Sequence, residues 1–142
     1  MTEIGRVLVI DDDPLQLEII KDYLYRRGVL EVICASDSLI AARMLRASDR
    51  EPLNLVITDI HMPGLDGIEL LSIMDATRPG LPIVLISGAG QEQILSARIL
   101  AVSYGLNVLG ALKKPIEDSE LDAALRRHPR CRYSDEPAFS TA

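Results

Sequence analysis

VLVIDDDP, residues 7–14, joins four apolar residues directly to three aspartates and a proline. The apolar run shows no polar alternation, which is typical of a strand buried on both faces. Asp13 followed by Pro14 is a typical helix start, with an N-cap and then proline at the first helical position. The stretch therefore predicts a buried strand that ends in acidic residues and leads at once into a helix.

The same order, a short apolar run and then a longer amphipathic stretch, repeats along the chain. Strands are predicted at residues 6–10, 30–35, 53–58, 82–87 and 108–113. Helices are predicted at residues 14–27, 38–47, 67–77, 91–104 and 118–127. Strict alternation implies parallel strands joined by right-handed crossovers, so the predicted fold class is α/β with a doubly wound sheet.

Size and charge limit what the chain can do. Its 142 residues suit one domain, predicted at 1–128, with a polar tail or linker at 129–142. The net charge of −6 disfavours contact with nucleic acid or an anionic membrane. No apolar stretch approaches the roughly 20 residues of a membrane span. The two cysteines lack zinc-type spacing and suit a reduced compartment, so we expect a cytoplasmic protein.

Polar residues follow the predicted strands at the ends where ligands gather in open parallel sheets. Residues 11–13, all Asp, follow the first strand, and Asp59 follows the third. Ser87 ends the fourth strand, and Lys113 and Lys114 lie at the end of the fifth. Because the carboxyl ends of parallel strands share one edge, we expect these side chains to converge.

This acidic edge predicts a particular chemistry. Carboxylates that lie close together repel one another unless a cation neutralises them. Oxygen ligands without His or Cys favour Mg²⁺, which prefers one or two carboxylates together with phosphate oxygens. A carboxylate also acts as a nucleophile toward phosphorus, and a metal ion with one lysine supplies the positive charge that the transferring group needs. We therefore expect Mg²⁺-dependent phosphoryl chemistry.

Four motifs carry a resemblance to a known family. VLVIDDDP, VITDIHMPGLDGIEL at 56–70, PIVLISG at 82–88 and LGALKKPI at 109–116 together resemble the receiver domains of two-component response regulators. The resemblance covers roughly residues 5–128. It implies a flavodoxin-like fold, a five-stranded parallel sheet of order 2-1-3-4-5 with five helices.

The resemblance also implies roles for the acidic residues. Asp59 would be the phosphoacceptor, which forms an aspartyl phosphate. Asp11, Asp12 and Asp59 would hold Mg²⁺, with the backbone carbonyl of His61 as a further ligand. The chain would then be a regulatory phosphoacceptor that assists its own phosphorylation and dephosphorylation, and not an enzyme.

Further roles fall on the fourth and fifth strands. The resemblance implies that Ser87 is the hydroxyl switch residue and that Lys114 binds the phosphoryl group. It also implies a cis peptide bond before Pro115, and this proline is the reason for preferring Lys114 to Lys113. One departure is Ala111, where receivers of the common type carry Tyr or Phe. The usual aromatic switch is therefore not expected here.

The implied partners are a sensor histidine kinase or a phosphotransfer protein. A homodimer through the face of the fourth helix, fifth strand and fifth helix is a further expectation, as is a downstream output domain. GLNVLGALKKPI at 105–116 also resembles receivers that precede EAL-type cyclic-di-GMP phosphodiesterase domains.

Two alternatives remain open at this point. Haloacid-dehalogenase-like phosphatases also place an aspartyl nucleophile after their first strand, which would here be Asp11. A receiver fold that has abandoned phosphorylation could instead serve as an interaction module. Phosphorylation on Asp11 in place of Asp59 would favour the first alternative, and failure to bind Mg²⁺ would favour the second.

Overall fold

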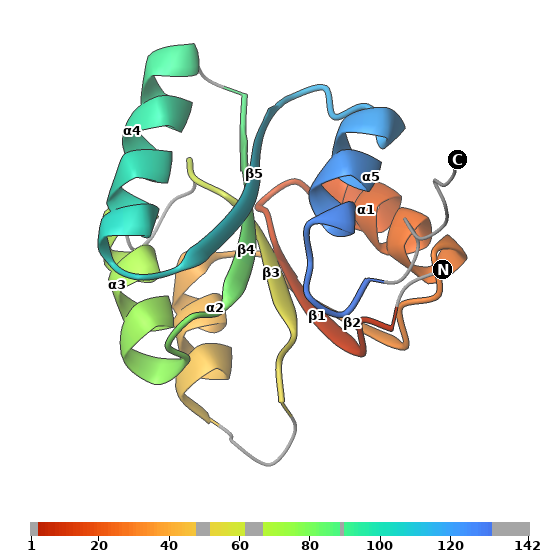
Figure 1. Cartoon of the computed structure of the whole chain (residues 1–142), viewed down its shortest axis with the longest axis horizontal. Coiled ribbons are helices and arrows are strands. Elements are labelled where there is room, and N and C mark those ends of the chain that lie inside the picture. Colours follow the sequence, from red (N-terminus) through yellow and green to blue (C-terminus); the bar gives the residue numbers. More distant parts are fainter. Residues whose placement is uncertain (1–2, 48–51, 62–66, 89, 132–142) are drawn as a thin grey trace, which may run out of the picture.

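The computed structural model describes residues 3–47, 52–61, 67–88 and 90–131. Strands and helices alternate through these residues, as Figure 1 shows. The strands are β1 (Arg6–Ile10), β2 (Glu31–Ala35), β3 (Leu55–Asp59), β4 (Pro82–Ser87) and β5 (Asn107–Lys113). The helices are α1 (Pro14–Arg26), α2 (Ser38–Ala47), α3 (Gly67–Thr77), α4 (Gln91–Ser103) and α5 (Asp118–Arg126).

The strands form one parallel sheet of order β2-β1-β3-β4-β5, as the resemblance implied. Helices α1 and α5 cover one face, and α2, α3 and α4 cover the other (Figure 1). The chain therefore has three layers, and the predicted α/β fold class is confirmed.

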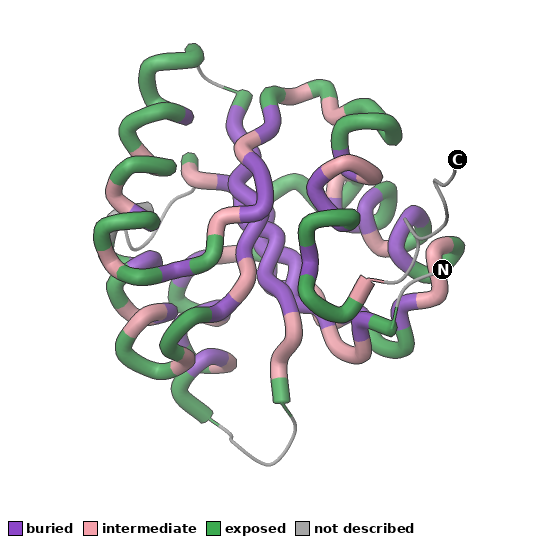
Figure 2. Tube along the Cα trace, in the orientation of Figure 1, coloured by how far each residue is buried: buried purple, intermediate pink, exposed green. Residues whose placement is uncertain are grey.

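The core lies on both faces of the sheet, and β1 shows how the sequence builds it. Val7 and Val9 pack toward α1 and α5, whereas Leu8 and Ile10 pack toward α2 and α3. All four side chains are buried, which is why this strand has no polar alternation. The buried segments of Figure 2 run through the strands at the centre of the molecule.

Local signals explain where the elements begin and end. Asp13 caps α1, because its side chain accepts a hydrogen bond from the backbone N–H of Leu15. Gly28 follows the end of α1 with a φ of 95°, in the left-handed region that favours glycine. The predicted start of the first helix is therefore confirmed in detail.

Small differences from the predicted boundaries have simple causes. Leu30 is 81% exposed and lies outside β2. Leu53 and Asn54 precede β3, because the Asn54 Oδ1 atom accepts hydrogen bonds from the backbone N–H groups of Gly5 and Arg6.

Most of the predicted tail, residues 132–142, lies outside the described residues. Within the described part of the chain, none of the helices has the length and apolar character needed to cross a membrane.

Strand β5 has one residue more than its neighbour can pair. Val108 lies opposite Ile83, but Gly110 lies opposite the next residue, Val84. Leu109 therefore has no partner among the described residues of β4, and the strand is bulged at this point.

Candidate functional site at the carboxyl edge of the sheet

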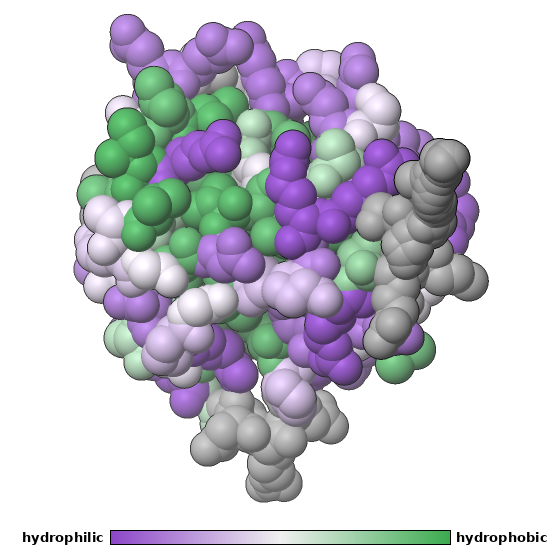
Figure 3. Space-filling model, in the orientation of Figure 1, coloured by the Kyte–Doolittle hydropathy of each residue, from purple (hydrophilic) through white to green (hydrophobic). Residues whose placement is uncertain are grey.

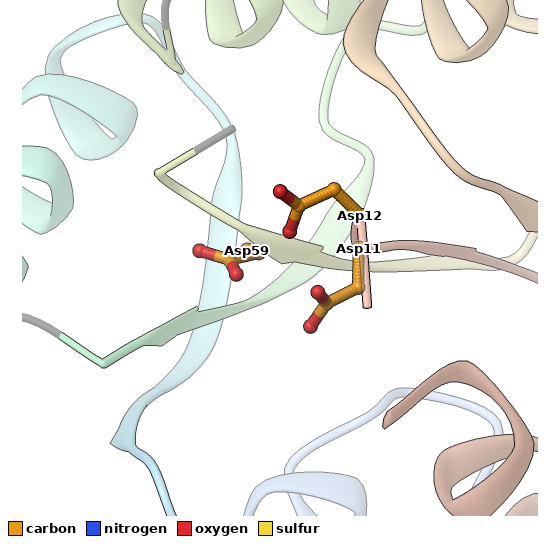
Figure 4. A group of neighbouring side chains, drawn as sticks. All are labelled: Asp11, Asp12 and Asp59. Atoms are coloured by element: carbon orange, nitrogen blue, oxygen red, sulfur yellow. The ribbon is translucent and has the colours of Figure 1, made fainter. Parts of the chain in front are cut away.

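Three carboxylates meet at the carboxyl edge of the sheet. Asp11 and Asp12 follow β1, and Asp59 is the last residue of β3. One oxygen from each of the three residues lies within 4.8 Å of the others. Figure 4 shows the three side chains projecting to the same side of the strand ends. The predicted convergence is therefore confirmed for Asp11, Asp12 and Asp59.

Backbone hydrogen bonds orient two of these carboxylates. Asp59 is 5% exposed, and its Oδ1 atom accepts a hydrogen bond of 2.8 Å from the backbone N–H of His61. Asp11 is fully buried, and its Oδ1 atom accepts a 3.0 Å bond from the backbone N–H of Asp13. The second oxygen of each carboxylate, Oδ2, therefore faces the other groups of the site.

Lys114 joins the two buried acids. Its Nζ atom lies 2.7 Å from Asp59 Oδ2 and 2.9 Å from Asp11 Oδ2. Burial alone would lower the pKa of Lys114, but its hydrogen bonds and charge interactions with the two acids raise it above the ordinary value. The backbone N–H of Lys114 donates to the Ser87 carbonyl at 2.8 Å, which holds this lysine beside the end of β4. The ammonium therefore stays charged in the site.

The donor set fits a divalent cation. Asp11 Oδ2 is buried, and the Lys114 ammonium lies 2.9 Å from it. This one ammonium is shared with Asp59, so the three neighbouring carboxylates still carry an excess of negative charge that favours a divalent cation. With Asp12 exposed at the rim, the three acids offer hard oxygen ligands on one side and leave positions for water and phosphate.

The other predicted residues lie around this cluster. Ser87 is fully buried at the end of β4, and His61 is exposed just beyond β3. The peptide bond between Lys114 and Pro115 is cis. Lys113 is exposed and lines a hollow beside α4, away from the three acids.

Asp13 takes no part in the cluster, because it serves as the N-cap of α1. This matters for the phosphatase alternative, which needs Asp11 and Asp13 as an Asp-x-Asp pair. With Asp13 bound to the Leu15 backbone N–H, the second acid of that pair is committed to the helix.

From the sequence alone, Arg127 is expected only to place a favourable positive charge near a helix C-terminus. In the structure it is the C-cap residue of α5, and its Nη1 atom donates a 2.8 Å hydrogen bond to the Leu109 carbonyl, at the bulge of β5. A glycine inside a strand often marks a bulge, so Gly110 was the available signal in the sequence.

Comparison with known families decides the identity of this arrangement. Residues 7–126 match the family model described as the response regulator receiver domain. This chain belongs to the response regulator receiver domain family. The acidic cluster, Ser87 and Lys114 all lie within the matched residues.

Full-length relatives of this receiver domain are considerably longer than the chain. It is 36% identical over 118 residues to the transcriptional activator protein PfeR of Pseudomonas aeruginosa, covering 83% of this chain and 35% of that protein. It is 33% identical over 116 residues to the two-component response regulator ORR23 of Oryza sativa, covering 82% of this chain and 16% of that protein. The chain thus spans a minor part of the length of these relatives.

Solved structures share the fold. A response regulator receiver domain from Clostridium thermocellum has a TM-score of 0.72 and 31% identity, covering 86% of this chain and 91% of that one. A CheY-like receiver domain from Methanospirillum hungatei also has a TM-score of 0.72, with 25% identity over 87% of this chain and 92% of that one. The chain is therefore a receiver domain of the two-component type, a class of regulatory phosphoacceptors in phosphorelay signalling that binds Mg²⁺ at an acidic cluster.

Proposed function

We propose that this receiver domain accepts a phosphoryl group on Asp59 in a Mg²⁺-dependent reaction. The observation that carries this proposal is the shared ammonium of Lys114, which lies between Asp59 and Asp11 at the carboxyl edge. The donor would be a sensor histidine kinase or a phosphotransfer protein, and the reaction would take place in the cytoplasm.

Each group of the site has its own part in phosphoryl transfer. An oxygen of the Asp59 carboxylate bonds to phosphorus while the bond from phosphorus to the donor imidazole breaks, and the freed imidazole nitrogen takes a proton from water. Lys114 transfers its hydrogen bond from Asp59 to a phosphoryl oxygen, and the Ser87 hydroxyl offers a second one. Mg²⁺, held by Asp11, Asp12, Asp59 and the His61 carbonyl, would neutralise the charge that develops on the phosphoryl oxygens.

Intact-mass spectrometry after incubation with acetyl phosphate and Mg²⁺ tests the assignment. We expect one added phosphoryl group in the natural chain and none in Asp59→Asn. Asp13→Asn is the matched control, since asparagine also caps helices and the variant should be modified normally. Modification of Asp59→Asn on Asp11 would support the phosphatase alternative, and no modification of the natural chain would support the non-phosphorylated interaction module.

We propose that the α4–β5–α5 face carries the output. Three apolar side chains on one side of α4, Leu95, Ile99 and Val102, are 58%, 61% and 57% exposed. Figure 3 shows an apolar patch in its upper left, over α4. Beside the three side chains lies a hollow of about 450 Å³. Its lining residues are Gln91, Glu92, Ile94, Leu95, Arg98, Ala111, Lys113 and Glu120.

The proposed occupant of this face is a second copy of the chain. Glu92 and Glu120 lie around the hollow together with Arg98 and Lys113, so the charges are self-complementary. A two-fold pairing would place acids of one copy against cations of the other around the apolar stripe, as an isologous interface requires. Ala111 leaves the hollow without the aromatic ring of common receivers, so phosphorylation would reach this face through the segment after β4 and through α4.

Sedimentation with and without beryllofluoride and Mg²⁺ tests the dimer. We expect the occupied state to associate more strongly, and Ile99→Lys to abolish the gain because it buries a charge in the stripe. Ile19→Lys on α1, where Ile19 is 53% exposed, is the matched control and should associate as the natural chain does. If Ile99→Lys and Ile19→Lys lose the gain in association equally, the α4–β5–α5 face is not the dimer interface.

The C-terminal boundary is also a proposal. We place the end of the receiver domain near His128 and read residues 129–142 as a linker toward an output domain. Its first residues remain attached, since the backbone N–H of Glu3 donates to the Arg130 carbonyl. The similarity of residues 105–116 to receivers that precede EAL domains supports a cyclic-di-GMP phosphodiesterase as the candidate output, and the longer reading frame would test this.

A further inference from the structure

Strand β5 breaks the usual alternation of side chains. Val108 packs toward the helical layer of α2, α3 and α4, and Leu109 packs toward the layer of α1 and α5. Gly110 also faces α5, because a Cβ atom added to it would lie only 3.1 Å from the Ala124 Cβ atom. Two consecutive residues thus face the same helical layer, which agrees with the missing partner of Leu109 in the β4–β5 register.

The bulge decides which lysine reaches the acidic cluster. Beyond it the alternation resumes, so Leu112 faces α5, Lys113 faces α4, and Lys114 reaches Asp59. In this register Ser87 lies opposite Lys113. A strand without the bulge would slip by one residue and bring Lys113 to the position now held by Lys114.

Helix α5 holds the bulge from one side. The Arg127 guanidinium donates a 2.8 Å hydrogen bond to the Leu109 carbonyl, at the unpaired residue itself. A hydrogen bond from a charged donor is stronger than a neutral one, and the planar guanidinium fixes its direction. The missing side chain of Gly110 lets α5 come close enough for this contact.

We propose that Arg127 is a positioning residue for the phosphoacceptor site. It holds the extra residue of β5 in place, and this extra residue selects Lys114 instead of Lys113 as the lysine that contacts Asp59. The inference rests on the proposed function of Asp59 and adds a residue on the far end of α5 to the machinery of that site.

The first experiment compares Arg127→Met with Arg126→Met. Both variants remove one positive charge from the C-terminal end of α5, but only Arg127 donates to Leu109 among the contacts described. We expect the rate of phosphorylation by acetyl phosphate with Mg²⁺ to fall roughly ten- to a hundredfold in Arg127→Met, because a displacement of about 1 Å at a reacting group can cost up to about a hundredfold. Arg126→Met should react at nearly the natural rate. Equal rates in the two variants would overturn the proposal.

A double-mutant cycle separates positioning from general stability. Residues far apart without shared partners normally have additive effects. We expect Arg127→Met to cost much less in a Lys114→Ala background, because there is no longer a lysine to position. In the Arg127→Met background, Lys113→Ala should cost more than it does in the natural chain. Additive effects in both cycles would mean that Arg127 does not act through the lysines.

Deletion of Gly110 tests the bulge directly. Without this residue, Leu109 would pair with Val84 and every later residue would keep its partner and its face. We expect this variant to be phosphorylated on Asp59 and to have lost its dependence on Arg127. A deletion variant that folds and still requires Arg127 would contradict the proposal.

Inter-strand nuclear Overhauser contacts give a readout without phosphorylation. The natural chain should show contacts between Val84 and Gly110, and Arg127→Met should show new contacts between Val84 and Leu109. An unchanged register in Arg127→Met would overturn the inference even if Asp59 is the phosphoacceptor. If the natural chain is not phosphorylated on Asp59, the proposed function fails, while the register still decides the role of Arg127.

Discussion

Two charged clusters in this receiver domain are built on opposite principles. At the carboxyl edge, Asp11 and Asp59 share the ammonium of Lys114 and Asp12 lies beside them, so among the described residues the acids outnumber the cations. Between α1 and α5, one carboxylate, Asp122, is surrounded by donors only.

We call this second group, Tyr23, Arg27 and Asp122, the α1–α5 clasp. The Tyr23 hydroxyl donates to Asp122 Oδ1, and the Arg27 Nε atom donates to the same oxygen at 2.9 Å. The Arg27 guanidinium also lies 4.4 Å from the centre of the Tyr23 ring, as in a cation–π contact. Burial alone would raise the pKa of Asp122, but the hydrogen bonds from Arg27 and Tyr23 and the charge of Arg27 lower it.

The charge balance differs between the clasp and the carboxyl edge because the clasp stabilises the fold and the carboxyl edge forms the candidate site. Every group in the clasp has a complementary partner, so the clasp should stabilise the folded chain. The carboxyl edge keeps an excess of negative charge, which costs stability until a cation arrives. The excess of negative charge therefore serves the site and does not stabilise the fold.

The largest expected effect is on the clasp. Asp122→Ala should lower the free energy of unfolding by about 2–3 kcal/mol, because it leaves the buried Tyr23 hydroxyl and the Arg27 guanidinium without their acceptor. Urea denaturation measures this loss. Asp22→Ala, which breaks the exposed ion pair with Arg26, should cost less than about 0.5 kcal/mol. Similar losses of unfolding free energy in Asp122→Ala and Asp22→Ala would mean that the clasp stabilises the fold no more than an exposed ion pair does.

A smaller effect concerns His128, a buried titratable group without an acidic partner among the described contacts. Its Nε2 atom bonds to the Asn54 carbonyl, and its Nδ1 atom accepts from the backbone N–H of Arg130, so the ring is neutral. Burial, with a contribution from the charge of Arg130, lowers the pKa of His128. The folded state thus disfavours the protonated ring.

Stability should therefore fall as the pH drops below the ordinary histidine pKa of about 6.5, by at most about 1.4 kcal/mol for each pH unit. The loss should stop below the lowered pKa of the folded state. Unfolding free energies measured at several pH values should show this slope in the natural chain and a weaker one in His128→Gln. Parallel curves for the two chains would show that another group is responsible.

The smallest effect tests the surplus of acid at the carboxyl edge. Asp12→Ala should raise the free energy of unfolding without Mg²⁺ by about 0.5 kcal/mol, because it relieves repulsion with Asp11 and Asp59. The same variant should lose phosphorylation. Denaturation and mass spectrometry measure both, with Asp13→Asn as the control. A destabilised Asp12→Ala protein that is phosphorylated at the natural rate would contradict both expectations.

The sequence predicted most of the fold because its signals are local. Asp13 and Pro14 mark the start of α1, and the unbroken apolar run of β1 identifies a strand covered on both sides. The site was predictable for a related reason, since strand ends of a parallel sheet meet at one edge.

Other features depend on residues far apart and gave no local pattern. Tyr23 and Asp122 are separated by 99 positions, and Arg127 reaches a carbonyl 18 positions earlier. Leu30 was predicted inside a strand because it is apolar, yet only the packing of the whole domain leaves it at the surface. The choice between Lys113 and Lys114 rested on the neighbouring proline, whereas the structure gives the bulge as its physical basis.

Among the described residues, the surplus of carboxylates over the Lys114 ammonium would make phosphorylation by small donors depend on a bound divalent cation. Small phosphorylated metabolites are anions, and the surplus negative charge at this edge repels them as long as no divalent cation is bound. Lys114 is also engaged with both carboxylates, so it is not free to attract them from a distance. Such a receiver would react slowly with small phosphodonors such as acetyl phosphate while the site lacks Mg²⁺, and binding of Mg²⁺ would remove this barrier.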